Sequence, residues 1–292
     1  MYDDAGRIVE VMENYVEGKT IAEDSTYNIF TKFWYDEVGN LELLIDTLGK
    51  VTYFEYDNAN RLVLVTINYV PAYKPDSEFN VTTQFRYDDI GNQIAFIDPL
   101  GTITRTYYDA LNQPITVVEN LSDWEFDNPN PPPFDPTSPD RNVPTWYSYD
   151  AVGNLTYIED ALGTMTCTCY NVRNLPHKSI TNPTVPNPCQ PYTGNGLSDL
   201  DIINQWSYDS VGNILSWTDP RASTTAYGYD DLNRLETLTN PLGYVTTFEY
   251  DALGNLTFMK DTQGVVTHYD YDELSRLSHV IQNFITGAPQ DP

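Results

Sequence analysis

The chain has few basic residues and no long apolar run. Fifteen Lys and Arg residues stand against 42 Asp and Glu residues in 292, which gives a formal net charge of −27. Nucleic acids and anionic membrane surfaces are bound through basic patches, so neither is an expected partner. No stretch of about 18 apolar residues occurs, so no membrane span is expected. The acidic balance suits a cationic partner or bound divalent ions instead.

Catalytic signatures are also scarce. The three histidines, His177, His268 and His279, have no consistent partner in the sequence. The chain lacks a Gly-x-Ser-x-Gly nucleophile motif, a phosphate loop and a dinucleotide-binding fingerprint. No residue is therefore given a catalytic or cofactor-binding role, and the sequence predicts that the protein is not an enzyme.

A Tyr-Asp pair recurs along the chain at a fixed stride. Its tyrosines, called station tyrosines below, are Tyr2, Tyr35, Tyr56, Tyr87, Tyr108, Tyr149, Tyr208, Tyr229, Tyr250 and Tyr271, with Tyr170 before an Asn completing the series. Six of the ten steps between neighbours are 21 residues, and the other four are longer. A fixed period with occasional insertions indicates tandem repeats that pack mainly on their neighbours.

The unit from Tyr244 to Gly264 shows how one repeat folds. Val245–Tyr250 is rich in β-branched and aromatic residues, which indicates a strand. Asp251 and Gly254 follow in a turn, because Asp bonds to the backbone ahead of it and Gly accepts a positive φ. A second strand and a second turn complete the unit. The predicted fold is all-β, with tandem hairpins forming a spiralling antiparallel sheet and no significant helix.

The recurring residues are predicted to be structural. An aromatic residue stands two positions before most station tyrosines, as in Phe54/Tyr56, and residues two apart share a sheet face, so these rings should line one face as stacked ladders. The station hydroxyls should bond to neighbouring backbone. The alternative is a platform that stacks sugars. Each Asp should cap its own turn, with calcium bridging as the alternative, although no Asp-x-Asp-x-Asp-Gly loop occurs. These structural residues are Tyr35, Asp36, Gly39, Tyr56, Tyr87, Asp88, Gly91, Tyr108, Tyr149, Asp150, Gly153, Tyr208, Asp209, Gly212, Tyr229, Tyr250, Asp251, Gly254 and Tyr271.

Extra residues occur only at the second turn, and only in alternate units. Residues 1–292 are therefore predicted to form a single array of about eleven repeats, with a two-repeat superperiod and inserts near 14–26, 68–80, 120–144 and 182–204. The inserts should emerge along one edge as a ridge, and loops on a rigid scaffold often carry binding. The run from Asn128 to Pro136 should be extended, polyproline-like chain.

The three cysteines allow one disulfide, with two alternative pairings. Cys167 and Cys169 are alternate residues of one predicted strand and share a face, so they cannot easily bond to each other. Cys189 lies in the next insert and can reach back to Cys167 or Cys169. A disulfide suits a secreted protein, and free buried thiols are the alternative. A metal site that includes His177 has no recognised spacing.

Tyr-Asp-x-x-Gly-Asn, followed by Asp-Pro-x-Gly and an aromatic strand, resembles the YD repeat, also called the rearrangement hotspot (Rhs) repeat. The resemblance covers nearly the whole chain outside the inserts. This family includes bacterial polymorphic toxins, shells of insecticidal toxin complexes, wall-associated bacterial proteins and teneurins. The resemblance implies a sheet that spirals into a hollow shell, which encloses a toxic domain in the toxins and supports adhesion in teneurins.

The chain departs from the toxin members in one respect. It stops at Gln290-Asp291-Pro292 without the Asp-Pro-x-Gly-Leu motif whose aspartates release the toxin, so no protease residue is assigned. It also starts in mid-strand at Met1 without a signal peptide, so a longer parent chain is expected.

The predicted function is that of a non-enzymatic extracellular scaffold, most simply a secreted bacterial one, in an Rhs-like shell or a larger surface assembly. Expected partners are further repeats of the same parent chain, copies joined by sheet-edge pairing, a protein cargo or a cell-surface glycan. No cofactor is expected, with calcium as the exception. Two alternatives stay open, an adhesive module that binds glycan or protein through the inserts and a self-assembling filament subunit.

Overall fold

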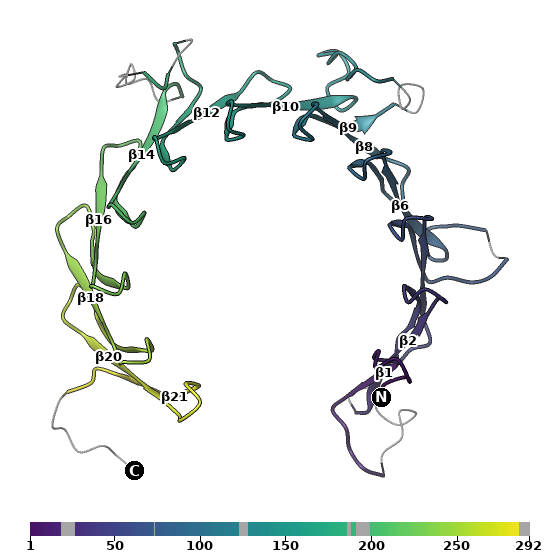
Figure 1. Ribbon diagram of the computed structural model, residues 1–292, viewed down its shortest axis with the longest axis horizontal. Coiled ribbons are helices and arrows are strands. Elements are labelled where there is room, and N and C mark those ends of the chain that lie inside the picture. Colours follow the sequence, from purple (N-terminus) through teal and green to yellow (C-terminus); the bar gives the residue numbers. More distant parts are fainter. Residues whose placement is uncertain (19–26, 73, 123–127, 186–187, 191–198, 286–292) are drawn as a thin grey trace. The chain divides into compact units, whose positions relative to one another are not determined.

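The computed structural model describes residues 1–18, 27–72, 74–122, 128–185, 188–190 and 199–285. The described residues form β-strands joined by turns and loops, with no helix among them (Figure 1). These described residues therefore contain no helix that is long and apolar enough to cross a membrane. The chain divides into two compact units, Met1–Trp146 and Tyr147–Pro292.

The first unit contains nine strands and the start of a tenth. Their bounds are β1 (Glu10–Glu13), β2 (Ile29–Tyr35), β3 (Leu41–Ile45), β4 (Val51–Tyr56), β5 (Leu62–Ile67), β6 (Val81–Tyr87), β7 (Gln93–Ile97), β8 (Ile103–Tyr108), β9 (Pro114–Leu121) and β10 (Val143–Tyr149). Each strand pairs antiparallel with the next along the chain, from β1–β2 to β9–β10.

The second unit repeats this plan. Its strands after β10 are β11 (Leu155–Glu159), β12 (Met165–Tyr170), β13 (Pro176–Thr181), β14 (Ile202–Tyr208), β15 (Ile214–Thr218), β16 (Thr224–Tyr229), β17 (Leu235–Thr239), β18 (Val245–Tyr250), β19 (Leu256–Lys260), β20 (Val266–Tyr271) and β21 (Leu277–Gln282). Successive strands from β11 to β21 again pair antiparallel. The all-β antiparallel hairpin fold is thus confirmed, whereas the treatment of 1–292 as one array stays a prediction.

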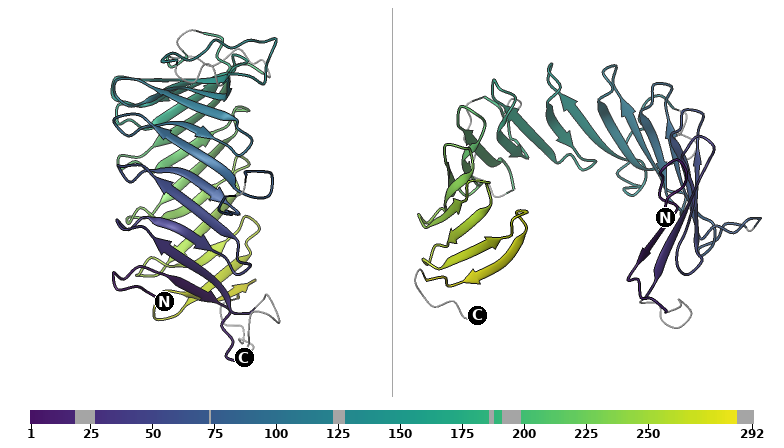
Figure 2. Two further views of the ribbon diagram at one scale, coloured as in Figure 1. Left: turned by 90° about the vertical axis from the view of Figure 1, so that its right-hand side faces the viewer. Right: turned by 60° about the horizontal axis from the view of Figure 1, so that its bottom comes forward.

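The two kinds of turn lie on opposite edges of each unit. In an antiparallel meander successive turns alternate between edges, so every Tyr-Asp turn falls on one edge and every second turn on the other. Figure 2 shows this alternation in both units. The described parts of the inserts follow the second edge. This geometry separates a uniform edge from a variable one.

A β-bulge recurs beside the Tyr-Asp turns. In the β4–β5 hairpin Glu55 lies opposite Leu64 and Tyr56 opposite Leu62, which leaves Val63 as an extra residue. The same register shift occurs just before the station tyrosine in other hairpins, including β6–β7, β16–β17 and β20–β21. A bulge bends its strand and increases the local twist. Its regular return gives every repeat the same bend.

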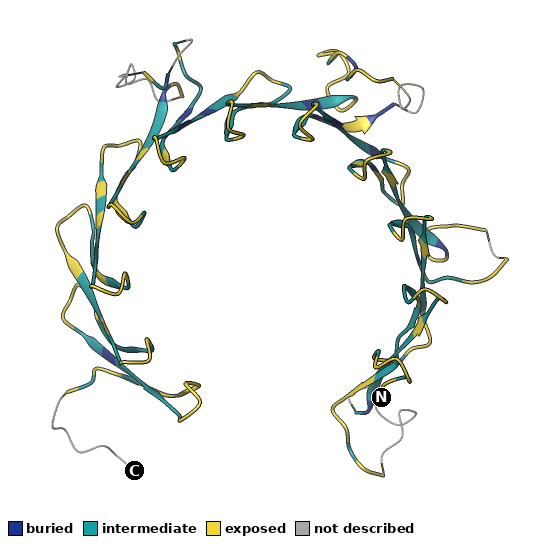
Figure 3. Cartoon of the chain, viewed as in Figure 1, coloured by how far each residue is buried: buried dark blue, intermediate teal, exposed yellow. Residues whose placement is uncertain are grey.

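Each unit is a single layer of sheet, so little of the chain is fully buried (Figure 3). The accessible surface is 19279 Å². A compact monomer of this mass, 33.2 kDa, would expose about 12,600 Å², so the chain exposes about 1.5 times as much. Small buried clusters do exist. One in the first unit joins Ile103, Tyr107, Val118 and Leu121, and one in the second joins Cys167, Cys169 and Ile180.

The substitution Ile180→Ala should test the second cluster. The Ile180 side chain is 0% exposed and packs against Cys167 and Cys169, so its truncation leaves a cavity. We expect the free energy of unfolding to fall by about 2–5 kcal/mol, measured by urea unfolding. The control Leu242→Ala changes a turn residue that is 80% exposed and should cost less than about 0.5 kcal/mol. Equal losses in the two variants would contradict packing around Ile180.

Candidate functional site

The station aspartates close the turns of one edge. Asp36 Oδ1 accepts the backbone N–H groups of Val38, Gly39 and Asn40 at 3.0, 2.7 and 2.8 Å, and Oδ2 accepts Asn40 Nδ2 at 2.9 Å. Gly39 has a φ of 101°, which an L side chain rarely adopts. The carboxylate therefore caps its own turn. Equivalent bonds to the Asn side chain recur at Asp88, Asp150, Asp209 and Asp251.

Most of the turns between these use arginine in place of the asparagine amide, whereas Gln113 and Leu175 occupy this position in the other two. Asp57 Oδ2 accepts Arg61 Nε at 2.7 Å, and Asn60 takes the positive φ, 59°, that Gly takes in the first kind of turn. The same ion pair occurs at Asp3–Arg7, Asp230–Arg234 and Asp272–Arg276. Two turn types thus alternate along the edge.

An amide bond joins the first turn type to the second. Asn40 Nδ2 donates to Asn60 Oδ1 at 3.2 Å, twenty residues further on. Equivalent bonds are Asn92–Asn112 (3.2 Å), Asn154–Asn174 (3.1 Å), Asn213–Asn233 (3.0 Å) and Asn255–Ser275 (3.3 Å). Each of these asparagines therefore closes its own turn and also holds the next one.

A guanidinium contact joins the second turn type to the next repeat. Arg61 Nη1 donates to the Asp88 carbonyl at 3.1 Å, and the Arg61 guanidinium lies 4.7 Å from the Tyr87 ring centroid. Arg234 makes the same pair of contacts with Asp251 and Tyr250, at 3.0 and 4.8 Å. A cation over an aromatic face is attracted by the ring quadrupole. Amide and guanidinium links thus alternate where the second turn type carries this arginine.

The station tyrosines use their hydroxyls as cross-strand ties. Tyr56 Oη donates to the Leu41 carbonyl at 3.0 Å, and Tyr250 Oη donates to Leu235 at 2.9 Å. Other such bonds run from Tyr35 to Ile8, Tyr87 to Leu62, Tyr108 to Gln93, Tyr170 to Leu155 and Tyr208 to Pro176. Burial, with the nearby Asp36 charge, raises the pKa of Tyr56, so this hydroxyl stays protonated as a donor.

The predicted ladder of stacked station rings needs correction. Successive station tyrosines are two strands apart, about 9.6 Å, whereas stacked rings lie about 4.5–7 Å apart. Ring contacts occur at other positions instead, such as Tyr53–Tyr69 at 4.8 Å and Phe85–Phe96 at 5.7 Å. Cohesion along the station edge therefore depends on hydrogen bonds and Arg–Tyr contacts. Tyr149, Tyr229 and Tyr271 occupy the equivalent ends of β10, β16 and β20.

Hydrogen bonds within the turns favour the ionised form of the Asp150 and Asp57 carboxylates. The Asn154 side-chain amide lowers the pKa of Asp150, and the Arg61 backbone N–H lowers that of Asp57. A depressed folded-state pKa stabilises the fold above the unfolded value of about 3.9, and this stabilisation is lost as pH falls through the folded value. Calcium binding by these aspartates stays a prediction, and the ion would compete with donors already bound.

Each insert is closed by a pair of residues, an Asn at its start and an Asn or Asp at its end, and we call this pair an insert clasp. In insert 68–80 the Asn80 backbone N–H donates to the Asn68 carbonyl at 3.1 Å, and Asn80 Oδ1 accepts the Val70 N–H at 2.7 Å. Asn68 Nδ2 donates to the Glu78 carbonyl at 2.8 Å. The corresponding pairs are Asn14/Asn28, Asn120/Asn142 and Asn182/Asp201. The stem is thus the same for inserts of different length.

These clasps were not predicted from the sequence, although an Asn or Asp stands at both ends of every insert and was the available signal. Parts of all four predicted inserts, including 19–26, 123–127 and 191–198, lie outside the described residues. The polyproline-like run from Asn128 to Pro136 is described and forms no strand or helix.

A groove of about 550 Å³ lies at the base of insert 68–80. The exposed side chains of Leu48, Ile67, Val70 and Phe79 line it. Asn68 Oδ1 is buried there and has no hydrogen-bond partner among the described residues. The groove therefore offers an apolar surface.

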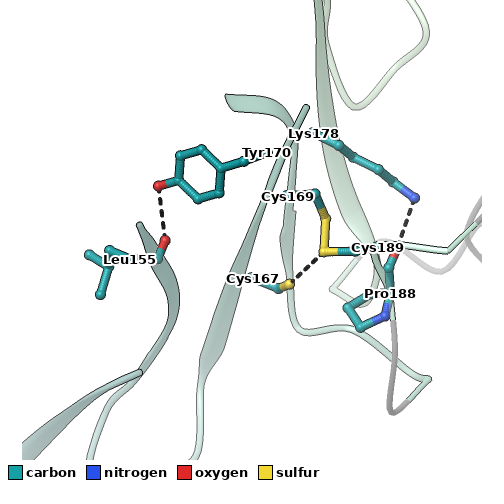
Figure 4. The surroundings of a disulfide bond; sticks show 7 residues. All are labelled: Leu155, Cys167, Cys169, Tyr170, Lys178, Pro188 and Cys189. Carbon is teal, nitrogen blue, oxygen red and sulfur yellow. Dashed lines mark hydrogen bonds between the residues drawn. A yellow bond between two sulfur atoms is a disulfide. The ribbon is translucent and has the colours of Figure 1, made fainter. Parts of the chain in front are cut away.

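The cysteines gather where insert 182–201 meets the sheet (Figure 4). Cys189 forms a disulfide with Cys169, and Cys167 is a free buried thiol whose Sγ lies 3.4 Å from Cys189 Sγ. Of the two pairings that the sequence left open, the structure contains the one with Cys169. His177 is the extra residue of the bulge in β13, and it is not among the residues of this cluster.

A family model named RHS Repeat matches residues 208–243 and 236–257. Residues 208–257 therefore carry the RHS repeat. The matched residues begin at the station Tyr208 and include the Asp230–Arg234 and Asp251–Asn255 turns described above. No curated protein sequence matches the chain.

Several solved structures share the fold of this chain. The crystal structure of TcdB2-TccC3-Cdc42 matches with a TM-score of 0.58 and 19% identity over 85% of this chain. The TcdB2-TccC3 structure without its hypervariable C-terminal region matches with a TM-score of 0.58 and 19% identity over 85% of this chain. The Photorhabdus luminescens Tc holotoxin pore with the TccC3-D651A mutation matches with a TM-score of 0.57 and 19% identity over 85% of this chain. This chain spans only 13%, 12% and 12% of those chains.

The pair Asp230→Ala and Asp231→Ala should separate turn closure from net charge. Both changes remove one acidic residue, but only Asp230 accepts the Arg234 guanidinium and the turn N–H groups, whereas Asp231 is exposed. We expect Asp230→Ala to lower the urea midpoint clearly and Asp231→Ala to leave it unchanged or raise it slightly. Equal midpoints would mean that the carboxylate does not stabilise the turn.

Proposed function

We propose that this chain is a non-enzymatic structural scaffold, a stretch of RHS-type wall that works outside the cell. The observation that carries this proposal is the large exposed surface, about 1.5 times that of a compact protein of the same mass. A chain that leaves both faces of its sheet exposed is suited to forming a wall around a protein cargo. The excess of acidic residues keeps such a wall soluble.

The two edges support different tasks in this proposal. The Tyr-Asp edge is engaged in amide and guanidinium links between repeats. The opposite edge carries the clasped inserts, which recur every four strands, or about 19 Å, where they are present. Recognition is therefore assigned to the insert edge and to the sheet faces, and rigidity to the Tyr-Asp edge.

In this proposal the wall is completed by further repeats of the same parent chain or by other copies that join sheet edges. Open edges accept strands readily. Enclosure of a protein cargo is the role that the toxin-shell resemblance favours. The Cys169–Cys189 disulfide supports an oxidising, extracellular location.

Small-angle X-ray scattering and light scattering of the 292-residue chain should test the scaffold proposal. A compact globule of this length has a radius of gyration of about 19 Å, and a single-layer wall must exceed this value clearly. We expect a monomer or a closed assembly with the larger radius. A monomer at about 19 Å would contradict the single-layer wall, and a long polymer would favour the filament alternative.

An adhesive role is the second candidate, and the groove beside insert 68–80 favours it. Ile67, Val70 and Phe79 are exposed apolar side chains that line this groove. Aromatic surface with a few polar groups is common in sites that bind small ligands, including sugars.

The substitution Phe79→Ser should test this adhesive role on an array of neutral glycans. If the groove binds a glycan, we expect Phe79→Ser to weaken retention at least tenfold, because the aromatic wall is lost. Leu111→Ser is the matched control, since Leu111 is an exposed turn residue on the opposite edge of the same unit. Equal retention by the two variants, or no retention of glycans by the unmodified chain, would remove support for glycan adhesion through this groove.

A further inference from the structure

Three sulfur atoms meet in one buried cluster of the second unit. Cys189 Sγ is bonded to Cys169 Sγ and also contacts Cys167 Sγ at 3.4 Å, and all three atoms lie within 4.8 Å of one another. Figure 4 shows Cys189 entering from the insert, with Cys167 and Cys169 both presented by β12. The Cys167 and Cys169 side chains are almost completely buried.

The strand geometry explains why Cys189 faces two partners. Cys167 and Cys169 are separated by one residue, so both side chains leave the same face of β12. Their Cα atoms are about 6.6–7 Å apart along the strand, which disfavours a bond between the two. Cys189 stands over this face, so a small rotation of its side chain can exchange one sulfur neighbour for the other.

Two polar side chains stand beside the free thiol. Lys178, on β13 directly opposite Cys169, lies close enough to Cys167 for its positive charge to favour a thiolate. Tyr157, on β11 opposite Cys167, packs against the same cluster. Burial raises the pKa of Cys167, and these two groups oppose that effect. Lys178 Nζ also donates to the Pro188 carbonyl at 3.0 Å, which holds the insert residue next to Cys189 in place.

We propose that these cysteines form an intramolecular thiol–disulfide exchange site, in which the disulfide that anchors the insert moves between Cys169–Cys189 and Cys167–Cys189. The Cys167 thiolate attacks Cys189 Sγ, a Cys167–Cys189 bond forms, and the Cys189–Cys169 bond breaks. The electron pair of the broken bond leaves on Cys169, which takes up the proton that Cys167 gave. The number of thiols and disulfides is unchanged, so no external oxidant or reductant takes part.

The exchange would keep the insert anchored at all times. Cys189 is bonded to β12 in both arrangements, and only the identity of the free thiol changes. The stem of this insert is also held by the Asn182/Asp201 clasp, so the sulfurs remain close during the exchange. This inference rests on the sulfur geometry and does not depend on the proposed scaffold role.

The first test uses Cys169→Ser, with Cys167→Ser as its matched control. Both variants are produced in an oxidising compartment and mapped by non-reducing peptide mass spectrometry. We expect Cys169→Ser to contain a Cys167–Cys189 disulfide and Cys167→Ser to retain Cys169–Cys189, each in most molecules. Two free thiols in Cys169→Ser, with an intact disulfide in Cys167→Ser, would overturn the proposal.

The second test uses the unmodified chain and so avoids any folding defect of the variants. After incubation at mildly alkaline pH without added thiol, the protein is quenched in acid, denatured and alkylated in acid. Fragmentation at Thr168 then distinguishes alkyl groups on Cys167 from those on Cys169. We expect both positions to be labelled, with a ratio independent of protein concentration. Labelling of Cys167 alone, or a ratio that changes with concentration, would overturn intramolecular exchange.

Discussion

Closure of the Tyr-Asp turn by its own carboxylate is the constraint on which the rest of this chain depends. A single layer of sheet buries few side chains, so a hydrophobic core cannot fix the direction of each strand. The Asp36 carboxylate orders four donors within one turn, and the amide of Asn40 then reaches the next turn. Hydrogen bonds within the turns thus fix the strand directions, as a hydrophobic core does in a compact domain. The amide bond between turns extends this order to the next repeat.

The alternation of links makes the two-repeat unit the true structural period. An amide leads from the Asn40 turn to the Asn60 turn, and a guanidinium leads from the Arg61 turn to Asp88. The residue that makes the second link varies along the chain. Leu175 occupies the position of the linking arginine, and Arg173, two residues earlier, donates to the Asp209 and Ser210 carbonyls instead, at 2.7 and 2.8 Å. The turn after β8 has Gln113 at this position and so has no guanidinium there. The guanidinium link is therefore not made by the same residue in every repeat.

Much of the fold could be predicted from the sequence because each repeat carries its own local signals. The Tyr-Asp stride located the strands, and Asp with Gly located the turns. The insert clasps escaped because Asn is common and the two members of a pair, such as Asn120 and Asn142, are far apart in sequence. The bulge opposite Glu55 and Tyr56 escaped because it depends on cross-strand register. The choice of Cys169 over Cys167 escaped because both thiols lie within reach of Cys189.

The insert edge can vary because its strands do not need the inserts for their pairing. The junction between β13 and β14 carries a clasped insert, whereas the equivalent junction between β17 and β18 is the short turn from Asn240 to Gly243. Both junctions join the same kind of strands, and both are followed by a Gly-Asn turn. Since the Tyr-Asp edge is continuous through either junction, a loop can be gained or lost there without a change in the links between repeats. Separation of the two edges thus lets one sheet stay uniform while its surface loops diverge.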